Sequence, residues 1–147
     1  MPPKKRRRRG KFNNKPVQAF GCKFRSKFEW RVARRLDKAG IKWEFEPRVT
    51  LPDGKYCLPD FWLPDFKTFI ELRPAKMVDD KLLHKIRLIK KTYGHEVVLC
   101  TDIMGAATFI GRLDESRSPS GPNSLWVFSG KRGERRDAFS ANDESRQ

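Results

Sequence analysis

Two acidic residues in the middle of the chain, Asp60 and Glu71, have the types and the spacing of a divalent metal site. They lie within residues 58–73, LPDFWLPDFKTFIELR, where two runs of strand-forming residues flank a Pro-Asp turn. If the chain folds back about this turn as a hairpin, Asp60 lies opposite Glu71, with Cβ atoms about 4.5–5.5 Å apart. Like charges at that distance destabilise a sheet unless a cation lies between them. Because both side chains offer oxygen ligands, Mg²⁺ is the cation that fits best.

Arg73 offers a second way to neutralise the same face of the hairpin. Side chains alternate along a strand, so Arg73 shares the face of Glu71 and would form an ordinary ion pair with it. The residue types alone do not distinguish a metal site from an ion pair with Arg73. A slip of one residue in the register would turn Glu71 into the core. The hairpin pairs Phe61 with Ile70, Trp62 with Phe69, and Leu63 with Thr68.

The same alternation separates an apolar face of the hairpin from a mixed one. Trp62 and Phe69 share the mixed face with the carboxylates, where they either stack on an unpaired base or pack beneath a neighbouring helix. The other face must turn to the core, and it carries Phe61, Leu63, Ile70 and Leu72. One stretch of chain therefore predicts both a part of the core and a candidate site.

A third carboxylate, Glu29, has two interpretations. Ser26 and Glu29 have the spacing of a capping box, in which Glu29 returns to the backbone amide of Ser26 at the start of a helix. Glu29 would instead reach the carboxylate face of the sheet if it were an outer metal ligand. Asp65 belongs to a second PDF sequence and so competes with Asp60, but Pro and Asp are common turn residues. We expect Asp65 to be structural.

Hydrophobic periodicity predicts the elements that hold these residues. Apolar residues at helical spacing predict two helices, over 24–39 and 80–93, each followed by a glycine. Strands are predicted at 41–46, on both sides of Asp53-Gly54, at 59–63 and 68–72, at 96–101 and, as an edge strand, at 124–128. This order predicts an α/β fold, with a central mixed sheet flanked by helices.

The organisation expected from these patterns is one domain between two tails. Residues 16–128 carry the predicted helices and strands. Residues 1–15 cannot bury a core and are expected to be a disordered basic tail. Residues 129–147 are expected to be a flexible C-terminal tail, because they lack an apolar pattern.

Charge makes nucleic acid the leading partner. The chain has 147 residues with 33 Lys and Arg and a net charge of +15, a field that attracts polyanions. A solvated surface that only keeps the protein soluble is the alternative. The residues expected to contact phosphates are Lys4, Lys5, Arg6, Arg7, Arg8 and Arg9 in the first tail and Lys81, Lys85, Lys90 and Lys91 in the second helix. A basic structural protein of a ribonucleoprotein or phage particle is a weaker possibility, which would leave Asp60 and Glu71 freely replaceable.

Several classes of protein are not expected. No apolar run approaches the roughly 18 residues of a membrane span, and no signal-peptide pattern follows the basic start. Three cysteines without a CxxC pair indicate neither a disulfide framework nor a zinc site. We therefore expect a cytoplasmic protein without a membrane partner or a small-molecule cofactor. In a eukaryotic host, the basic run at residues 1–15 would act as a nuclear import signal.

These residues resemble the PD-(D/E)XK nuclease superfamily. The motif appears as Pro59-Asp60 followed by Glu71-Leu72-Arg73, with Glu29 upstream on a helix. The order of FRSKFEWRVARRLDKAGIKWEFEP, LPDF and IEL resembles the phage endonuclease I family of Holliday-junction resolvases, and also the endonuclease subunit of some transposons. The resemblance extends over roughly residues 20–101.

The resemblance implies a restriction-endonuclease-like core and a metal-dependent DNA endonuclease. In such an enzyme Asp60 and Glu71 bind Mg²⁺ or Mn²⁺, the backbone carbonyl of Leu72 completes the inner shell, and Glu29 is the outer carboxylate. The metal activates water and stabilises charge on the scissile phosphate of branched or structured DNA. Because resolvases of this kind cut two strands symmetrically, the resemblance also implies a homodimer.

Arg73 departs from the motif, since the family's lysine falls on this position. An arginine can stabilise charge on a phosphate, but its guanidinium is too basic to exchange a proton. Lys76 would supply the ammonium instead, or it would be a phosphate-contacting or solvated lysine. The departure leaves a second function open, that of a catalytically inactive nuclease fold that only binds DNA or RNA.

Overall fold

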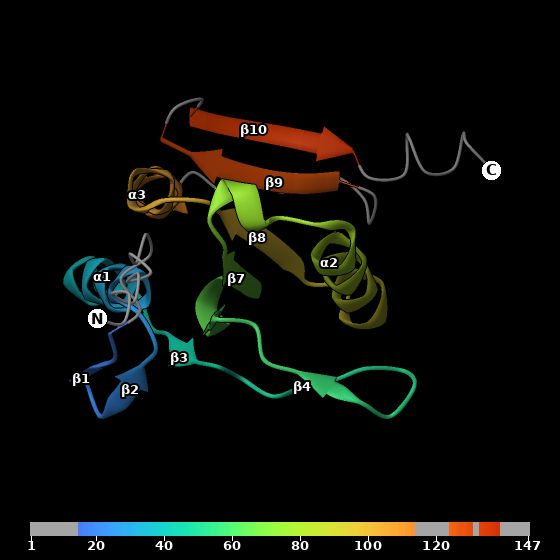
Figure 1. Ribbon diagram of the computed structural model, residues 1–147, viewed down its shortest axis with the longest axis horizontal. Coiled ribbons are helices and arrows are strands. Elements are labelled where there is room, and N and C mark those ends of the chain that lie inside the picture. Colours follow the sequence, from blue (N-terminus) through green and yellow to red (C-terminus); the bar gives the residue numbers. More distant parts are fainter. Residues whose placement is uncertain (1–14, 114–123, 131–132, 139–147) are drawn as a thin grey trace, which may run out of the picture.

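Within the described residues, a mixed sheet of six strands forms the centre of the fold (Figure 1). In spatial order these strands are β10 (Gly133–Ala138), β9 (Ser124–Ser129), β8 (Glu96–Cys100), β7 (Thr68–Leu72), β6 (Phe61–Leu63) and β3 (Glu44–Phe45). β8 runs parallel to β7 and β9, and the other neighbours are antiparallel. The computed structural model describes residues 15–113, 124–130 and 133–138. The predicted α/β class and mixed sheet are confirmed.

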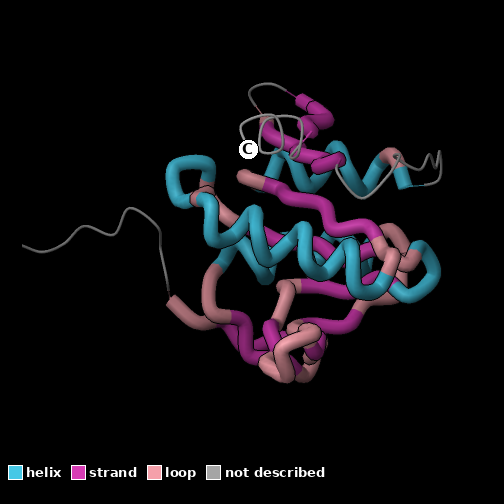
Figure 2. The backbone as a smooth tube through the Cα atoms, turned by 90° about the vertical axis from the view of Figure 1, so that its right-hand side faces the viewer, coloured by secondary structure: helices cyan, strands magenta, loops and turns pink. Residues whose placement is uncertain are grey.

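Helices cover both faces of this sheet. They are α1 (Lys27–Lys38), α2 (Asp80–Tyr93) and α3 (Ile103–Gly111), with short 3₁₀ turns η1 (Pro64–Phe66) and η2 (Ala75–Met77). Figure 1 shows α1 and α3 on one side of the sheet and α2 on the other. In Figure 2 α2 runs across the face of the strands. No helix of the described chain is long and apolar enough to cross a membrane.

Each helix begins at a side chain that accepts a hydrogen bond from a backbone amide of the first turn. Ser26, Asp79 and Asp102 have this role in α1, α2 and α3. α2 ends at Gly94, whose φ of 73° is the left-handed conformation that glycine adopts at little cost. The predicted helix over 80–93 is therefore confirmed at both ends.

Two short hairpins lie outside the central sheet. One pairs β1 (Val17–Ala19) with β2 (Cys22–Phe24), and the other pairs β4 (Val49–Thr50) with β5 (Tyr56–Cys57). The turn between β4 and β5 is the predicted Asp53-Gly54 turn. The Asp53 side chain accepts from the Lys55 amide, and Gly54 has a φ of 90°.

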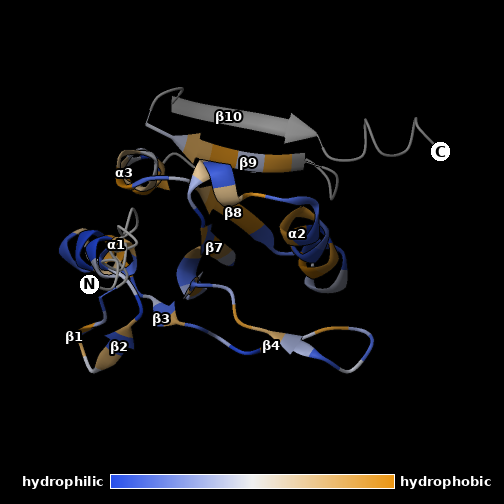
Figure 3. Cartoon of the chain, in the orientation of Figure 1, coloured by the Kyte–Doolittle hydropathy of each residue, from blue (hydrophilic) through white to orange (hydrophobic). Residues whose placement is uncertain are grey.

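The predicted register of the central hairpin is confirmed. β6 and β7 pair Phe61 with Ile70, Trp62 with Phe69, and Leu63 with Thr68. The predicted core face packs with α1 and α3 in one hydrophobic cluster of buried residues. The other face packs with α2 in a second cluster, and Figure 3 shows that β8, between these layers, is coloured mostly as hydrophobic. Trp62 and Phe69 belong to the second cluster, so they pack beneath a helix and are not a stacking platform.

Apart from shifts of one or two residues, as in β6 and β8, the structure corrects three predicted boundaries. The helix predicted over 24–39 begins at Lys27, because the extended backbone of its cap at Ser26 leaves Phe24 in β2. The strand predicted over 41–46 is only Glu44–Phe45, because pairing with β6 ends there.

The third boundary is at the end of the sheet. β9 is not an edge strand, because β10 pairs along its outer side and brings Gly133–Ala138, predicted as flexible tail, into the sheet. Strands pair through their backbone hydrogen bonds, so pairing does not need an apolar pattern. The sequence of β10 has no such pattern, and β10 was therefore not predicted. Among the described elements, the patterns also missed β1, β2 and α3. The predicted phosphate contacts from Lys4 to Arg9 lie outside the described residues.

Gly105 lets α3 lie directly on β9. A Cβ atom at this position would be 2.2 Å from the carbonyl oxygen of Phe128, which is backbone and cannot rotate away. We expect Gly105→Ala to lower the free energy of unfolding by about 3 kcal/mol or more, as overpacking against backbone does. Chemical denaturation measures this loss.

Gly111 in the same helix is the matched control. A Cβ atom there meets nothing within 4 Å, so Gly111→Ala should leave stability unchanged or raise it by up to about 1 kcal/mol. Equal denaturation midpoints for the two variants would contradict the close approach of α3 to β9.

Candidate functional site

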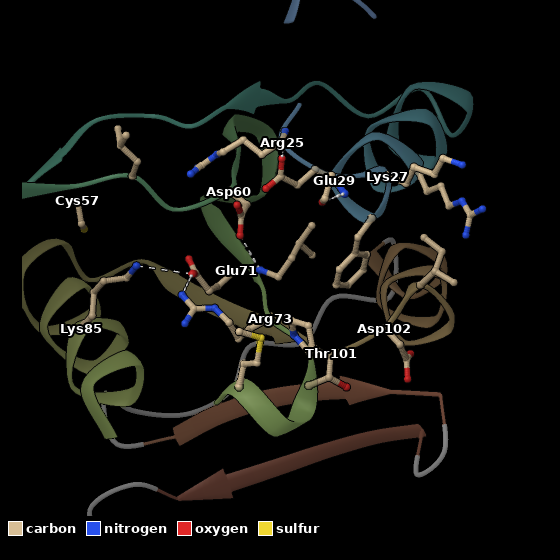
Figure 4. Close-up of a pocket in the computed structure, with 18 of the residues that line it drawn as sticks. Arg25, Lys27, Glu29, Cys57, Asp60, Glu71, Arg73, Lys85, Thr101 and Asp102 are labelled. Carbon is tan, nitrogen blue, oxygen red and sulfur yellow. Dashed lines mark hydrogen bonds and ion pairs between the residues drawn. The ribbon is translucent and has the colours of Figure 1, made fainter. Parts of the chain in front are cut away.

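Asp60 and Glu71 meet at the end of the β6–β7 hairpin, as predicted. Asp60 directly precedes β6, and its Oδ2 accepts a hydrogen bond of 2.7 Å from the Leu72 amide in β7. Glu71 lies in β7, and the side chains of both residues reach the same pocket (Figure 4). They are buried, with exposed fractions of 7% for Asp60 and 4% for Glu71. Acidic groups so far from solvent need partners, because burying an unpaired charge is costly.

Glu71 has two cationic partners. The Arg73 guanidinium donates to Glu71 Oε2 at 3.0 Å, and the Lys85 ammonium lies 3.6 Å from the same oxygen. Arg73 comes from the residues after β7, whereas Lys85 reaches across from α2 (Figure 4). The ion pair that the sequence left as an alternative to a metal is therefore present, with a second cation beside it.

Asp60 is less well compensated. Burial raises the pKa of Asp60 well above its usual range, and the neighbouring charge of Glu71 raises it further. The hydrogen bond from the Leu72 amide and the charge of Lys85 act in the opposite direction. Asp60 therefore holds a proton to higher pH than an exposed aspartate does.

The pocket above these carboxylates is lined by five basic and four acidic side chains. Its volume is about 1230 Å³, and basic side chains lie on several sides of it. Those lining it are Arg25, Lys27, Arg31, Arg73 and Lys85. Figure 4 shows that Lys27 points away from the two carboxylates, so the cations differ in what they can reach. A phosphate in this pocket can interact with these cations, of which Arg73 and Lys85 also pair with Glu71.

The donor set fits a divalent cation at two residues. Asp60 and Glu71 offer oxygen ligands, and the pKa of Asp60 is raised partly by the charge of Glu71, a repulsion that a cation between them would relieve. In the part of the chain that the structure describes, no group of three or more His, Cys, Asp or Glu side chains is arranged to hold a metal. Water and substrate oxygens would have to complete the coordination, as is usual for Mg²⁺.

Glu29 lines the same pocket but is occupied elsewhere. Its Oε1 accepts a hydrogen bond of 2.7 Å from the Arg25 amide, while its own amide donates to Ser26 Oγ at 3.3 Å. Glu29 therefore takes part in capping α1, as one interpretation predicted. Its carboxylate accepts from the amide of Arg25, however, whereas the prediction was the amide of Ser26. Burial raises the pKa of Glu29, and the Arg25 amide partly offsets that effect.

The basic residues predicted to contact phosphate or to act in catalysis differ in their exposure. Lys76 is exposed on η2 and is not among the residues lining the pocket. Lys81 and Lys91 are exposed on α2, where they are accessible to a phosphate. Lys90, predicted as a phosphate contact, is instead buried, and its ammonium lies 3.2 Å from Glu96. The reason is its position one turn after Ile86 on the buried side of α2.

Sequence reasoning missed the place of Lys85. It assigned this lysine to a phosphate-binding flank together with the exposed lysines of α2. Lys85 lies three residues after Leu82 and four before Ile89, both of which are buried, so it borders the side of α2 that faces the sheet. That spacing was the available signal, but the sequence could not show which strand α2 would cover.

Comparison with protein-family models, with curated proteins and with solved structures finds no match for this chain.

Proposed function

We propose that this protein is a metal-dependent DNA endonuclease of the PD-(D/E)XK type, built on a restriction-endonuclease-like core. The observation that carries the proposal is the buried pair Asp60 and Glu71, at the end of the β6–β7 hairpin, in a pocket that basic side chains also line. Two buried carboxylates that repel each other destabilise the fold unless a cation compensates them, as the raised pKa of Asp60 next to Glu71 indicates. Such a cost is typical of functional sites.

Asp60 and Glu71 are the residues that would hold Mg²⁺ or Mn²⁺, with the Leu72 carbonyl as the ligand that the motif implies. When bound, the metal supplies an acidified water molecule and charge stabilisation on the phosphate. The hydrogen bond from the Leu72 amide fixes the Asp60 carboxylate in place. Burial would strengthen the attraction between the Asp60 carboxylate and a bound divalent cation, since fewer waters screen it.

Arg73 and Lys85 divide the task of the motif's single lysine. Both lie within 3.6 Å of Glu71 Oε2, so either can reach a phosphate held beside that carboxylate. Arg73 stabilises negative charge but keeps its proton. Lys85 carries an ammonium that can both stabilise charge and exchange a proton. The departure at position 73 therefore does not remove a titratable cation from the site.

A cleavage assay tests the proposal. We expect the wild-type protein to hydrolyse DNA in Mg²⁺ or Mn²⁺ and to stop when the metal is chelated. Duplex, single-stranded and four-way-junction DNA should be compared, because the proposed substrate is branched or structured. Glu71→Gln should lower the rate at least about 100-fold, since it removes one of the two proposed metal ligands.

Glu44→Gln is the matched control, since Glu44 is an exposed strand glutamate of β3. It should cleave as the wild type does. Absence of cleavage in both metals, and also in the Arg73→Lys variant, would overturn the proposal. Sedimentation of the protein with a four-way junction would show whether a homodimer is the acting species.

A second candidate function is a nuclease fold that binds nucleic acid without cutting it. Two observations favour it: Glu71 already has cationic partners in Arg73 and Lys85, and no three-residue metal group is present in the described chain. Calorimetric titration of Mn²⁺ into the protein separates the two functions. Binding that disappears in Glu71→Gln supports the endonuclease, and salt-sensitive DNA binding without metal binding supports the second function.

A further inference from the structure

The rim of the pocket carries apolar side chains that the proposed hydrolysis does not use. Tyr56, Leu58 and Met77 line the pocket and are exposed at 50%, 39% and 47%. Large apolar groups left in solvent beside a charged site are typical of ligand-binding surfaces. They line the same pocket as Asp60 and Glu71, so a ligand held at the carboxylates has apolar surface beside it.

Tyr56 is held in position from two directions. The Arg48 guanidinium lies over its ring, with Cζ 3.9 Å from the ring centroid. The β4–β5 hairpin that carries Tyr56 is anchored by buried Val49, in the cluster with α2, and by the Tyr93 hydroxyl, which donates to the Thr50 carbonyl at 2.6 Å. A ring fixed in this way loses little conformational freedom when a ligand stacks on it.

We propose that Tyr56 is a stacking platform for an unpaired base next to the phosphate held at Asp60 and Glu71. With the guanidinium on one side of the ring, a base on the other side would complete a three-layer stack. Paired bases present only their edges in the grooves, so a side-chain ring stacks on a base that has left the helical stack. The preferred substrate is therefore DNA with an unpaired nucleotide at a flap, gap or junction. This inference rests on the proposed function for the position of the phosphate.

Binding without metal isolates the stacking step. Two labelled duplexes are compared in EDTA, one fully paired and one with a flap whose first unpaired base is 2-aminopurine. We expect the wild-type protein to bind the flap about tenfold more tightly than the paired duplex, the effect of one stacked base. The 2-aminopurine fluorescence should be quenched on binding.

Three variants assign the preference to the ring. Tyr56→Ala should lose the preference and the quenching while keeping its affinity for the paired duplex. Tyr56→Phe should keep both, because the ring remains. Phe20→Ala, at an aromatic residue of similar exposure (46%) that does not line the pocket, should behave as the wild type.

The outcomes separate this inference from the proposed function. If wild-type protein binds both duplexes equally, or if Tyr56→Ala keeps the preference, the stacking platform is wrong even when metal-dependent cleavage is observed. If no cleavage occurs but the preference is present and lost in Tyr56→Ala, the endonuclease is wrong and the base-binding site stands.

Discussion

Replacing Asp60 with asparagine is expected to abolish metal-dependent DNA cleavage and to raise the melting temperature of the metal-free protein. The asparagine side-chain oxygen can still accept the hydrogen bond from the Leu72 amide, so the local geometry is kept. What disappears is a buried charge that repels Glu71. The gain should be a few degrees, which is about what 1 kcal/mol gives a domain of this size.

The size of that gain should depend on pH in a definite direction. In the unfolded chain an aspartate ionises at about pH 4. In the folded protein, burial and the charge of Glu71 keep Asp60 protonated to higher pH. Between these two pKa values the folded state binds more protons, so wild-type stability falls as pH rises through the window and stays lower above it. The Asp60→Asn variant has no such proton, and the difference between the two proteins should widen as pH rises.

Thermal melts of metal-free wild type and Asp60→Asn across this pH range measure the effect. Asp65→Asn is the control, because Asp65 belongs to the second PDF sequence and is exposed on η1. It should change neither cleavage nor the pH dependence. Cleavage that survives Asp60→Asn, or a variant less stable than wild type at neutral pH, would contradict the role assigned to Asp60.

Lys85→Met is expected to lower the cleavage rate about 100-fold, because it removes a cation close to Glu71 and the proposed phosphate position. Methionine keeps much of the length and apolar character of the side chain, so folding should be little affected. Single-turnover cleavage at saturating protein measures the chemical step separately from DNA binding.

Two further variants define what Lys85 contributes. Lys81→Met, at an exposed lysine one turn earlier in α2, should reduce affinity slightly and leave the single-turnover rate unchanged. Lys85→Arg keeps the charge but cannot exchange a proton. If Lys85→Arg cleaves slowly and its pH–rate profile is altered, Lys85 transfers a proton. If Lys85→Arg cleaves at the wild-type rate, Lys85 contributes only its positive charge. Equal single-turnover rates for Lys85→Met and wild type would show that Lys85 does not contribute to the cleavage step.

The central hairpin could be predicted from sequence because everything that determines it is local. The turn at Asp65, the alternation of side chains and the requirement for an apolar face together set Phe61 against Ile70. The position of Asp60 then follows from the register, with no knowledge of the rest of the chain. Helix α2 was predictable for the same reason, since its cap at Asp79 and its stop at Gly94 are adjacent to it.

Contacts between distant segments could not be predicted in this way. Lys85 reaches Glu71 only because α2 packs over the β7 side of the sheet, and periodicity does not say which strand a helix covers. β10 gains its place by backbone pairing with β9, which leaves no apolar pattern in its sequence. Glu29 is a mixed case, since the capping spacing was visible but the choice of the Arg25 amide depended on the path into α1.

The two hydrophobic clusters on opposite faces of the sheet have a consequence for how the site opens. Glu29 belongs to α1, which packs in one cluster, and Lys85 belongs to α2, which packs in the other, while Asp60 and Glu71 lie on the hairpin between them. The pocket thus lies between two packed layers, and local opening of one layer need not involve the other. When α2 loosens, the carboxylates stay on the hairpin but lose Lys85, so the charge balance of the site is coupled to the hydrogen-exchange behaviour of one helix.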